Sequence, residues 1–323
     1  MRPLKFHPIL KQTLWGGERI IPYKELASGL SRVGESWELS GMPGSESVVA
    51  EGPWAGSTLS ELIGRFGAEL LGKANYARFG QEFPLLVKFI DAREDLSIQV
   101  HPDDELARKR HGKSGKCEMW YVLEAEPGAS LLTGFSRPIA PAEYERRVAD
   151  NTLTDVLNRQ AIASGDVFYL PAGRVHSIGK GSFIVEIQQS SDITYRIYDF
   201  DRRDAAGNSR ELHTELAREA IDFESSENSR ITYAPENNQE VRLVTTPYFT
   251  TSLYTLTART RCDWSATDSF VAIILLQGSG SLTDNEGNRI DIRQGETWLL
   301  PASTQWTEIT PHTATLRLLT SRI

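Results

Sequence analysis

Thiol groups are scarce in this chain of 323 residues, which has only two cysteines, Cys117 and Cys262. They lie far apart in the sequence and belong to no paired spacing. A disulfide scaffold and a thiolate zinc cluster both need more cysteines, so the sequence excludes both. Free cysteines are typical of a reducing compartment, and we therefore expect a cytoplasmic protein.

Long apolar runs and an excess of positive charge are also missing. No segment approaches the roughly 20 apolar residues that span a membrane, and residues 1–14 alternate polar and apolar side chains, unlike a signal peptide. The formal net charge is -8, from 35 Lys and Arg against 43 Asp and Glu. Such a field repels nucleic-acid phosphates, so we expect neither a nucleic-acid nor a membrane partner, although a local basic patch for a small phosphate remains allowed.

From Ser36 onward the chain consists mainly of short runs rich in Val, Ile, Phe, Tyr and Trp, separated by Gly, Pro, Asn and Asp. This pattern predicts a mainly β protein built as a sandwich or barrel. Helical apolar spacing predicts a helix over 58–71, two short helices within 141–160 and another over 211–221. Polar residues 224–230 and 235–239 mark a boundary, which gives domains 1–230 and 231–323.

An internal repeat crosses that boundary. The segment GDVFYLPAG at 165–173 is echoed by GETWLLPAS at 295–303. His176 follows the first glycine by eleven residues, and the same offset in the second copy gives Trp306. Residues 270–276 also lack an acidic side chain comparable to Glu118. We therefore predict two related β units, of which the second binds no metal and has a structural role.

Four potential metal ligands accompany the first copy: Gln99, His101, Glu118 and His176. Gln99 and His101 share one face of an alternating strand, Glu118 opens the next apolar run, and His176 follows a Pro-Ala-Gly turn. Taken singly, each is more often a turn residue or a solvated side chain. Together, two imidazoles, a carboxylate and an amide oxygen suit Zn²⁺ or a similar first-row divalent ion.

The chain resembles the cupin superfamily and, more narrowly, the type I mannose-6-phosphate isomerases of the short bacterial form. The resemblance covers nearly the full length, through the motifs LWGG (14–17), GESWELS (34–40), PLLVK (84–88), SIQVHP (97–102), GKCEMWY (115–121) and SDITYR (191–196). It implies two cupin-type β-barrel or jelly-roll units with a few short helices. It also implies that mannose 6-phosphate and fructose 6-phosphate are interconverted by proton transfer through an enediol, in a monomer or weak homodimer that takes a small sugar phosphate.

The resemblance assigns roles residue by residue. It implies one Zn²⁺ per chain at the four ligands, a catalytic Arg196, and active-site positions for Lys88, Lys116 and Glu186. Longer members carry a large helical insertion and a lysine shortly after the arginine, and this chain lacks both. An arginine from a later segment, Arg202, Arg203 or Arg210, could contact the phosphate in place of the missing lysine. The alternative for each of them is a solvent-exposed surface role.

The residues themselves leave the proton carrier open. Desolvation or a nearby cation can bring a lysine close to neutrality, and Lys116, two residues before Glu118, is either such a shuttle or an electrostatic clamp. Lys88 lies in an apolar run, where a buried lysine is expected to have an acidic partner or a functional role. The alternative is that its side chain extends to the barrel mouth. Glu186 is a second base or the partner of a ligand histidine. Arg196 offers a planar fork to an anionic oxygen, or is a surface arginine paired with a nearby aspartate.

Two other functions remain open at this point. Two histidines and a carboxylate on a cupin also describe non-haem iron oxygenases. A non-catalytic cupin that binds a sugar phosphate would keep the pocket without turnover. The presence of Lys88, Lys116, Glu186 and Arg196 together favours the isomerase, since a sugar sensor does not need all four.

Overall fold

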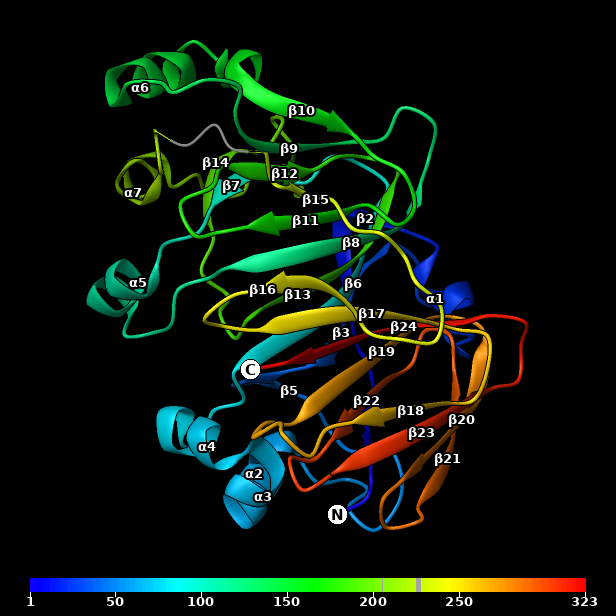
Figure 1. Ribbon diagram of the computed structural model, residues 1–323. Coiled ribbons are helices and arrows are strands. Elements are labelled where there is room, and N and C mark those ends of the chain that lie inside the picture. The colour runs from blue at the N-terminus through cyan, green and yellow to red at the C-terminus, as the bar shows by residue number, and fades with distance from the viewer. Residues whose placement is uncertain (205, 225–227) are drawn as a thin grey trace.

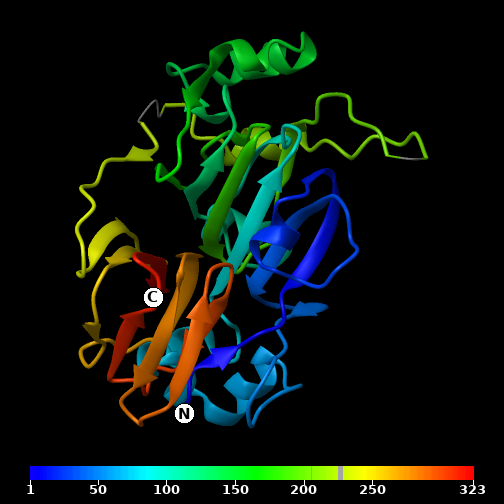
Figure 2. The same cartoon turned by 90° about the vertical axis from the view of Figure 1, so that its right-hand side faces the viewer.

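A computed structural model describes residues 1–204, 206–224 and 228–323. The predicted mainly β architecture is confirmed: two pairs of sheets lie one above the other, and the sheets of the described residues stay open (Figures 1 and 2). Among the described residues, no helix is both long and apolar enough to cross a membrane.

The first unit, mostly in blue, cyan and green in Figure 1, has a large and a small sheet. The large N-sheet runs in the order β15 (Arg230–Ile231), β11 (Val167–Leu170), β8 (Glu118–Ala125), β13 (Ser182–Gln189), β6 (Leu85–Ala92), β2 (Ile9–Gly17) and β3 (Val33–Leu39). The small N-sheet runs in the order β10 (Leu157–Ala161), β9 (Ser130–Phe135), β12 (His176–Ile178), β7 (Ile98–Val100) and β14 (Tyr195–Tyr198).

The second unit repeats this arrangement in orange and red. The large C-sheet runs in the order β1 (Leu4–Lys5), β22 (Thr297–Leu300), β19 (Val271–Gln277), β24 (Leu316–Arg322), β17 (Thr250–Leu256) and β16 (Val241–Thr245). The small C-sheet consists of β18 (Thr260–Asp263), β23 (Trp306–Pro311), β20 (Ser279–Asp284) and β21 (Arg289–Arg293). The start of the chain therefore pairs with the second unit, through β1 and β22 (Figure 2). A short hairpin joins β4 (Gly41–Met42) to β5 (Ser45–Glu46).

One apolar layer joins the two units. Phe89 and Phe183 of the large N-sheet belong to the same buried cluster as Ile274 and Leu299 of the large C-sheet. Alternate residues of a strand point to opposite faces, so each large sheet buries one face in this layer and turns the other toward the interior of its own unit. Each fully buried aromatic or aliphatic side chain contributes about 2 kcal/mol, which makes the layer a major source of cohesion.

Helices cap the two ends of the assembly. The helix predicted over 58–71 begins at the predicted Thr58, in a capping box with Glu61, but is interrupted at Gly67, whose φ of +48° is left-handed. It therefore divides into α2 (Leu59–Phe66) and α3 (Ala68–Leu71), followed by α4 (Lys73–Phe79), while α1 (Ile20–Tyr23) lies between β2 and β3. A left-handed residue cannot continue a right-handed helix, which explains the break.

The outer face of the small N-sheet is covered by α5 (Asp104–His111), α6 (Pro141–Ala149) and α7 (Thr214–Ala220). The predictions for α6, with its proline in the first turn, and for α7 are confirmed. The prediction of a second short helix within 141–160 is largely wrong. A 3₁₀ turn covers Leu153–Val156, and the next residues form strand β10, which pairs with β9. Of the predicted boundary, residues 225–227 lie outside the described residues.

The strand pairing follows the sequence repeat. In the first unit Leu170 lies opposite Glu118, and in the second Leu300 lies opposite Val271. Val271 thus occupies the register position of Glu118.

The structural counterpart of His176 in the second unit is not the residue that the sequence offset predicts. Ile178 pairs with Leu131 and Ile309 pairs with Leu282, all four within the interior clusters of their units. Two residues earlier on each strand stand His176 and Thr307, so Thr307 is the counterpart of His176. Trp306 points the other way, because the second turn is one residue longer.

Candidate functional site

The small N-sheet presents a row of polar side chains on its inner face. His176 on β12 and Arg196 on β14 both lie opposite Gln99 on β7. Their strand neighbours, such as Val100 and Ile197, face the helix-covered cluster on the other side. Strand alternation therefore directs all three polar side chains into the interior of the first unit.

The large N-sheet presents a second row that faces the first. Trp120 on β8 lies opposite Glu186 on β13, which lies opposite Lys88 on β6. Their neighbours, including Met119 and Val185, belong to the apolar layer between the units. Glu118 is on the inner face of the same strand as Trp120, two residues earlier, and so looks toward His176.

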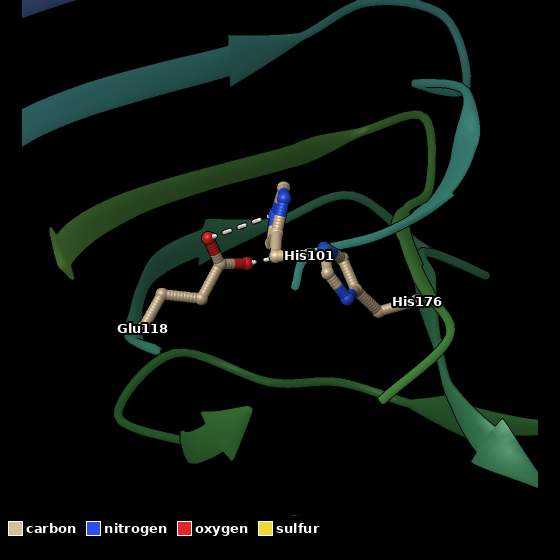
Figure 3. Close-up of side chains that lie close together, drawn as sticks. All are labelled: His101, Glu118 and His176. Carbon is tan, nitrogen blue, oxygen red and sulfur yellow. Dashed lines mark ion pairs between the residues drawn. The ribbon is translucent and has the colours of Figure 1, made fainter. Parts of the chain in front are cut away.

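His101, Glu118 and His176 converge from three segments, and Figure 3 shows their side chains turned toward one another. Glu118 Oε2 lies 3.4 Å from His101 Nε2, and Glu118 Oε1 lies 3.2 Å from His176 Nε2. One possible ligand atom from each residue lies within 4.8 Å of the others, and all three side chains are buried. Gln99 adjoins them, with its Nε2 at 3.3 Å from His176 Nε2.

The chemistry of these atoms suits a divalent cation. His101 Nε2 and both Glu118 carboxylate oxygens are buried and make no hydrogen bond among the described residues, although Glu118 Oε2 forms an ion pair with Lys116 Nζ. Leaving such groups unsatisfied costs about 1–3 kcal/mol each, and more for a charged group. Two imidazole nitrogens and a carboxylate make a common zinc ligand set. The predicted ligands His101, Glu118 and His176 are thus brought together, with the Gln99 side chain beside them.

Both imidazole rings are oriented by a hydrogen bond at Nδ1. The Nδ1 atoms of His101 and His176 lie 2.8 Å and 2.7 Å from the carbonyl oxygens of Ile193 and Arg174. A carbonyl only accepts, so Nδ1–H donates and the lone pair of Nε2 faces the other ligands.

The local charges keep the ligands in the forms that a metal binds. Burial, with the charge of Lys116, lowers the pKa of His101 to about 3, and burial also lowers the pKa of His176. Burial opposes ionisation of Glu118, but Lys116 and the two histidines outweigh it and hold the Glu118 pKa well below its ordinary value. The unprotonated nitrogens and the ionised carboxylate are the metal-binding states.

The two lysines have different carboxylate partners. Lys116 Nζ lies 2.9 Å from Glu118 Oε2, next to the metal ligands. Lys88 Nζ lies 2.9 Å from Glu186 Oε1 and 3.9 Å from Glu35. Burial works against the Lys88 charge, but Glu186 and Glu35 outweigh it and raise the pKa of Lys88. Lys88 is therefore an ammonium group inside an ion pair, which answers why a lysine is tolerated in this apolar run.

A cavity of about 140 Å³ opens beside the ligands. Its wall contains the predicted Gln99, Lys88, Lys116, Glu186 and Arg196. Other lining residues include Trp15, Glu35, Ser97, Thr194 and Arg210.

Arg196 lies on this wall rather than in a surface ion pair. Its Nη1 donates to the Glu211 carbonyl at 3.0 Å, and its Nε is buried without a partner among the described residues. Asp192 is paired with Lys113, and Asp199 with Arg202 and Arg210. Burial, with the neighbouring charge of Arg210, lowers the pKa of Arg196. A guanidinium remains charged under these conditions, so the site offers a cation to an anionic ligand.

Of the three later arginines, one reaches the cavity. Arg210 lines it while bound to the buried Asp199. Arg202 is held by Asp199 and by the Asp95 carbonyl, and the exposed Arg203 donates to the Gly207 carbonyl.

Two side chains of the site did not follow from the sequence reasoning. Trp120 Nε1 donates to Glu186 Oε2 at 3.0 Å, and its ring meets that of His176 edge to face at 5.4 Å. Glu35 approaches Lys88 from β3. Both lie inside the quoted motifs, GKCEMWY and GESWELS, and this is the signal that could have found them.

Comparisons with known proteins are consistent with this geometry. Residues 4–132 match the family model described as phosphomannose isomerase type I, catalytic domain. The chain is 34% identical over 303 residues to the probable mannose-6-phosphate isomerase GmuF of Bacillus subtilis strain 168, covering 93% of each chain. It is 33% identical over 302 residues to the mannose-6-phosphate isomerase of Streptococcus mutans, covering 93% of this chain and 92% of the relative. The crystal structure of the mannose 6-phosphate isomerase from Bacillus subtilis superposes with a TM-score of 0.90 at 30% identity, over 100% of both chains.

Proposed function

The chain belongs to the type I phosphomannose isomerase family, and from this premise we propose that it interconverts mannose 6-phosphate and fructose 6-phosphate with the help of Zn²⁺. One observation carries the proposal. The buried His101 Nε2 and the Glu118 carboxylate, which make no hydrogen bond among the described residues, lie beside a cavity whose wall also holds Lys116 and Arg196. A metal-binding triad next to fixed cations suits a substrate that has both a carbonyl and anionic oxygens.

We assign the metal to His101 Nε2, His176 Nε2 and the Glu118 carboxylate, with the Gln99 amide oxygen as fourth ligand after rotation of its amide. When bound, Zn²⁺ supplies Lewis-acid polarisation of the sugar carbonyl. The neutral amide leaves the charge of the ion largely uncompensated, since the carboxylate is the only anionic ligand of the set.

The reaction moves one proton between C2 and C1 through an enediol, so a group on the cavity wall must accept and return it. Both Glu186 oxygens already accept hydrogen bonds, from Lys88 and Trp120. Lys88 is held as an ammonium by its carboxylate partners, and Arg196 keeps its charge. We therefore assign the proton transfer to Lys116 Nζ, because its carboxylate partner, Glu118, is a metal ligand in this proposal and would bind the ion instead.

The remaining cations hold the substrate. Lys88 donates hydrogen bonds to sugar oxygens, and the Arg196 guanidinium faces the negative charge that develops on the enediolate. We expect the protein to work as a monomer or weak homodimer.

A coupled assay of the purified protein with mannose 6-phosphate tests the proposal, before and after chelation and after adding back Zn²⁺. We expect turnover that chelation removes and Zn²⁺ restores, with solvent deuterium appearing at the transferred position in D₂O. Full activity of the metal-free protein would exclude the metal role. A zinc-loaded protein without turnover would exclude the isomerase, and oxygen uptake or sugar-phosphate binding alone would then identify an oxygenase or a sensor.

A further inference from the structure

Trp120 is fully buried and lies behind the cavity wall rather than on it. Its indole N–H donates to Glu186 Oε2, and the other oxygen of the same carboxylate, Oε1, accepts from Lys88 Nζ at 2.9 Å. The carboxylate is thus fixed at both ends, and the position of the Lys88 ammonium depends on it.

We propose that Trp120 is a positioning residue, which fixes the Glu186 carboxylate and thereby holds the Lys88 ammonium in one place on the cavity wall. Trp120, Glu186 and Lys88 lie directly opposite one another on adjacent strands, so backbone pairing sets their spacing. Without the indole donor, Glu186 Oε2 has no other described hydrogen-bond donor, and the carboxylate can turn about its last bond. Lys88 would then follow it or swing toward Glu35, which lies 3.9 Å away.

The ring of Trp120 adds a second restraint. It contacts His176 edge to face, with ring centroids 5.4 Å apart. Packing of this kind limits rotation of both rings. Substitution by phenylalanine removes the N–H but keeps an aromatic ring near His176, which separates the hydrogen bond from the packing.

The second unit supplies a matched control. Trp298 is also buried, donates from Nε1 to Glu296 Oε2 at 3.1 Å, and Glu296 Oε1 lies 2.6 Å from Lys5 Nζ. The same three residue types therefore meet in the second unit, in a sequence region far from the proposed metal ligands, and Glu296 is held there by Arg293 as well. Each variant loses one indole hydrogen bond to a carboxylate that also binds a lysine, so Trp298→Phe controls for the loss of such a bond away from the cavity.

The test compares Trp120→Phe with Trp298→Phe in the zinc-loaded protein. For Trp120→Phe we expect kcat to fall roughly 10- to 100-fold, with KM changed less than about threefold and zinc content unchanged. For Trp298→Phe we expect wild-type kcat. In a Glu186→Gln background the Trp120→Phe substitution should lower kcat less than it does in the wild type, because its effect runs through that carboxylate.

A second measurement does not depend on turnover, and it separates this inference from the isomerase assignment on which it rests. Reductive methylation followed by mass spectrometry reports how accessible Lys88 is. We expect faster labelling of Lys88 in Trp120→Phe and unchanged labelling in Trp298→Phe, where Lys5 should respond instead. Equal kcat in both variants, or a fall in kcat that only tracks zinc loss, overturns the positioning role. Inactive wild-type protein with the expected labelling overturns the isomerase assignment alone.

Discussion

The two units build the same strand framework around different interiors. In the first unit, Trp120, Glu186 and Lys88 lie in one row across the sheet, and in the second the corresponding row is Ile273, Thr320 and Ser252. The position of Glu118 is taken by Val271, and that of His176 by Thr307. One interior therefore gathers buried charges, while the other is filled by an apolar cluster with a few hydroxyl groups.

This difference shows how the molecule divides its tasks. Buried charges are costly unless each is paired, and the first unit pairs Lys88 with Glu186 and Lys116 with Glu118. The second unit avoids that cost and packs its larger sheet against the first through the shared apolar layer. We expect that substitutions at matching positions will change activity in one unit and stability in the other.

The largest difference is expected between His176→Ala and Thr307→Ala. Removal of the imidazole takes away a metal ligand, so zinc content and turnover should both be lost, with activity falling by about 10³-fold or more. Thr307→Ala should keep both. Metal analysis and the isomerase assay check this pair, and zinc retained at full stoichiometry in His176→Ala would show that the ligand set is wrongly assigned.

Arg196→Ala should separate metal binding from activity. Its guanidinium lines the cavity without touching the three metal ligands, so we expect full zinc content and a loss of activity of roughly 10²- to 10³-fold. Arg261→Ala is the control, because Arg261 stacks on Trp306 with 4.3 Å to the ring centroid, outside the second interior. Equal activity of the two variants would remove Arg196 from the reaction.

The convergence of the proposed metal ligands could be predicted in part, because some of its sequence signals are local. Gln99 and His101 alternate along one strand, and His176 follows a turn whose sequence is repeated later in the chain. The hydrogen bond from Trp120 to Glu186 is not local: it joins residues 66 positions apart, and it depends on β8 pairing with β13. The periodicity of each segment predicts a strand, but it does not predict which strands pair with each other.

Two errors have similar physical origins. Residues 157–160 were expected in a helix, but they lie in a strand that pairs with β9, and tertiary pairing overrides local propensity in so short a segment. Trp306 was matched to His176 by counting from a glycine. A turn that is one residue longer reverses which side chain points inward, and sequence counting does not detect such a shift.

A charge introduced into the interior of the second unit should show how much a buried carboxylate costs without the ion pairs that the first unit provides. Val271→Glu places a carboxylate at the register position of Glu118 but among apolar neighbours. The cation next along the paired strand, Arg322, already forms an ion pair with Glu240. We expect the free energy of unfolding to fall by about 3 kcal/mol or more. Urea unfolding measures it, with Val271→Thr as a control of similar shape that costs about 1–2 kcal/mol. Similar losses in the two variants would mean that water reaches this interior.

The smallest expected effect concerns a polar contact at the position that corresponds to His176 in the second unit. Trp264 Nε1 donates to Thr307 Oγ1 at 3.0 Å, and both residues are buried. Thr307→Val keeps the shape of the side chain but leaves the indole N–H without an acceptor, which should lower the free energy of unfolding by about 1 kcal/mol. Adding Trp264→Phe removes the stranded donor as well, so the double variant should lose less than the sum of the two single variants. If the losses were additive, Thr307 would stabilise the second unit through its packing rather than through this bond, and the hydroxyl at the position of His176 would have no role of its own.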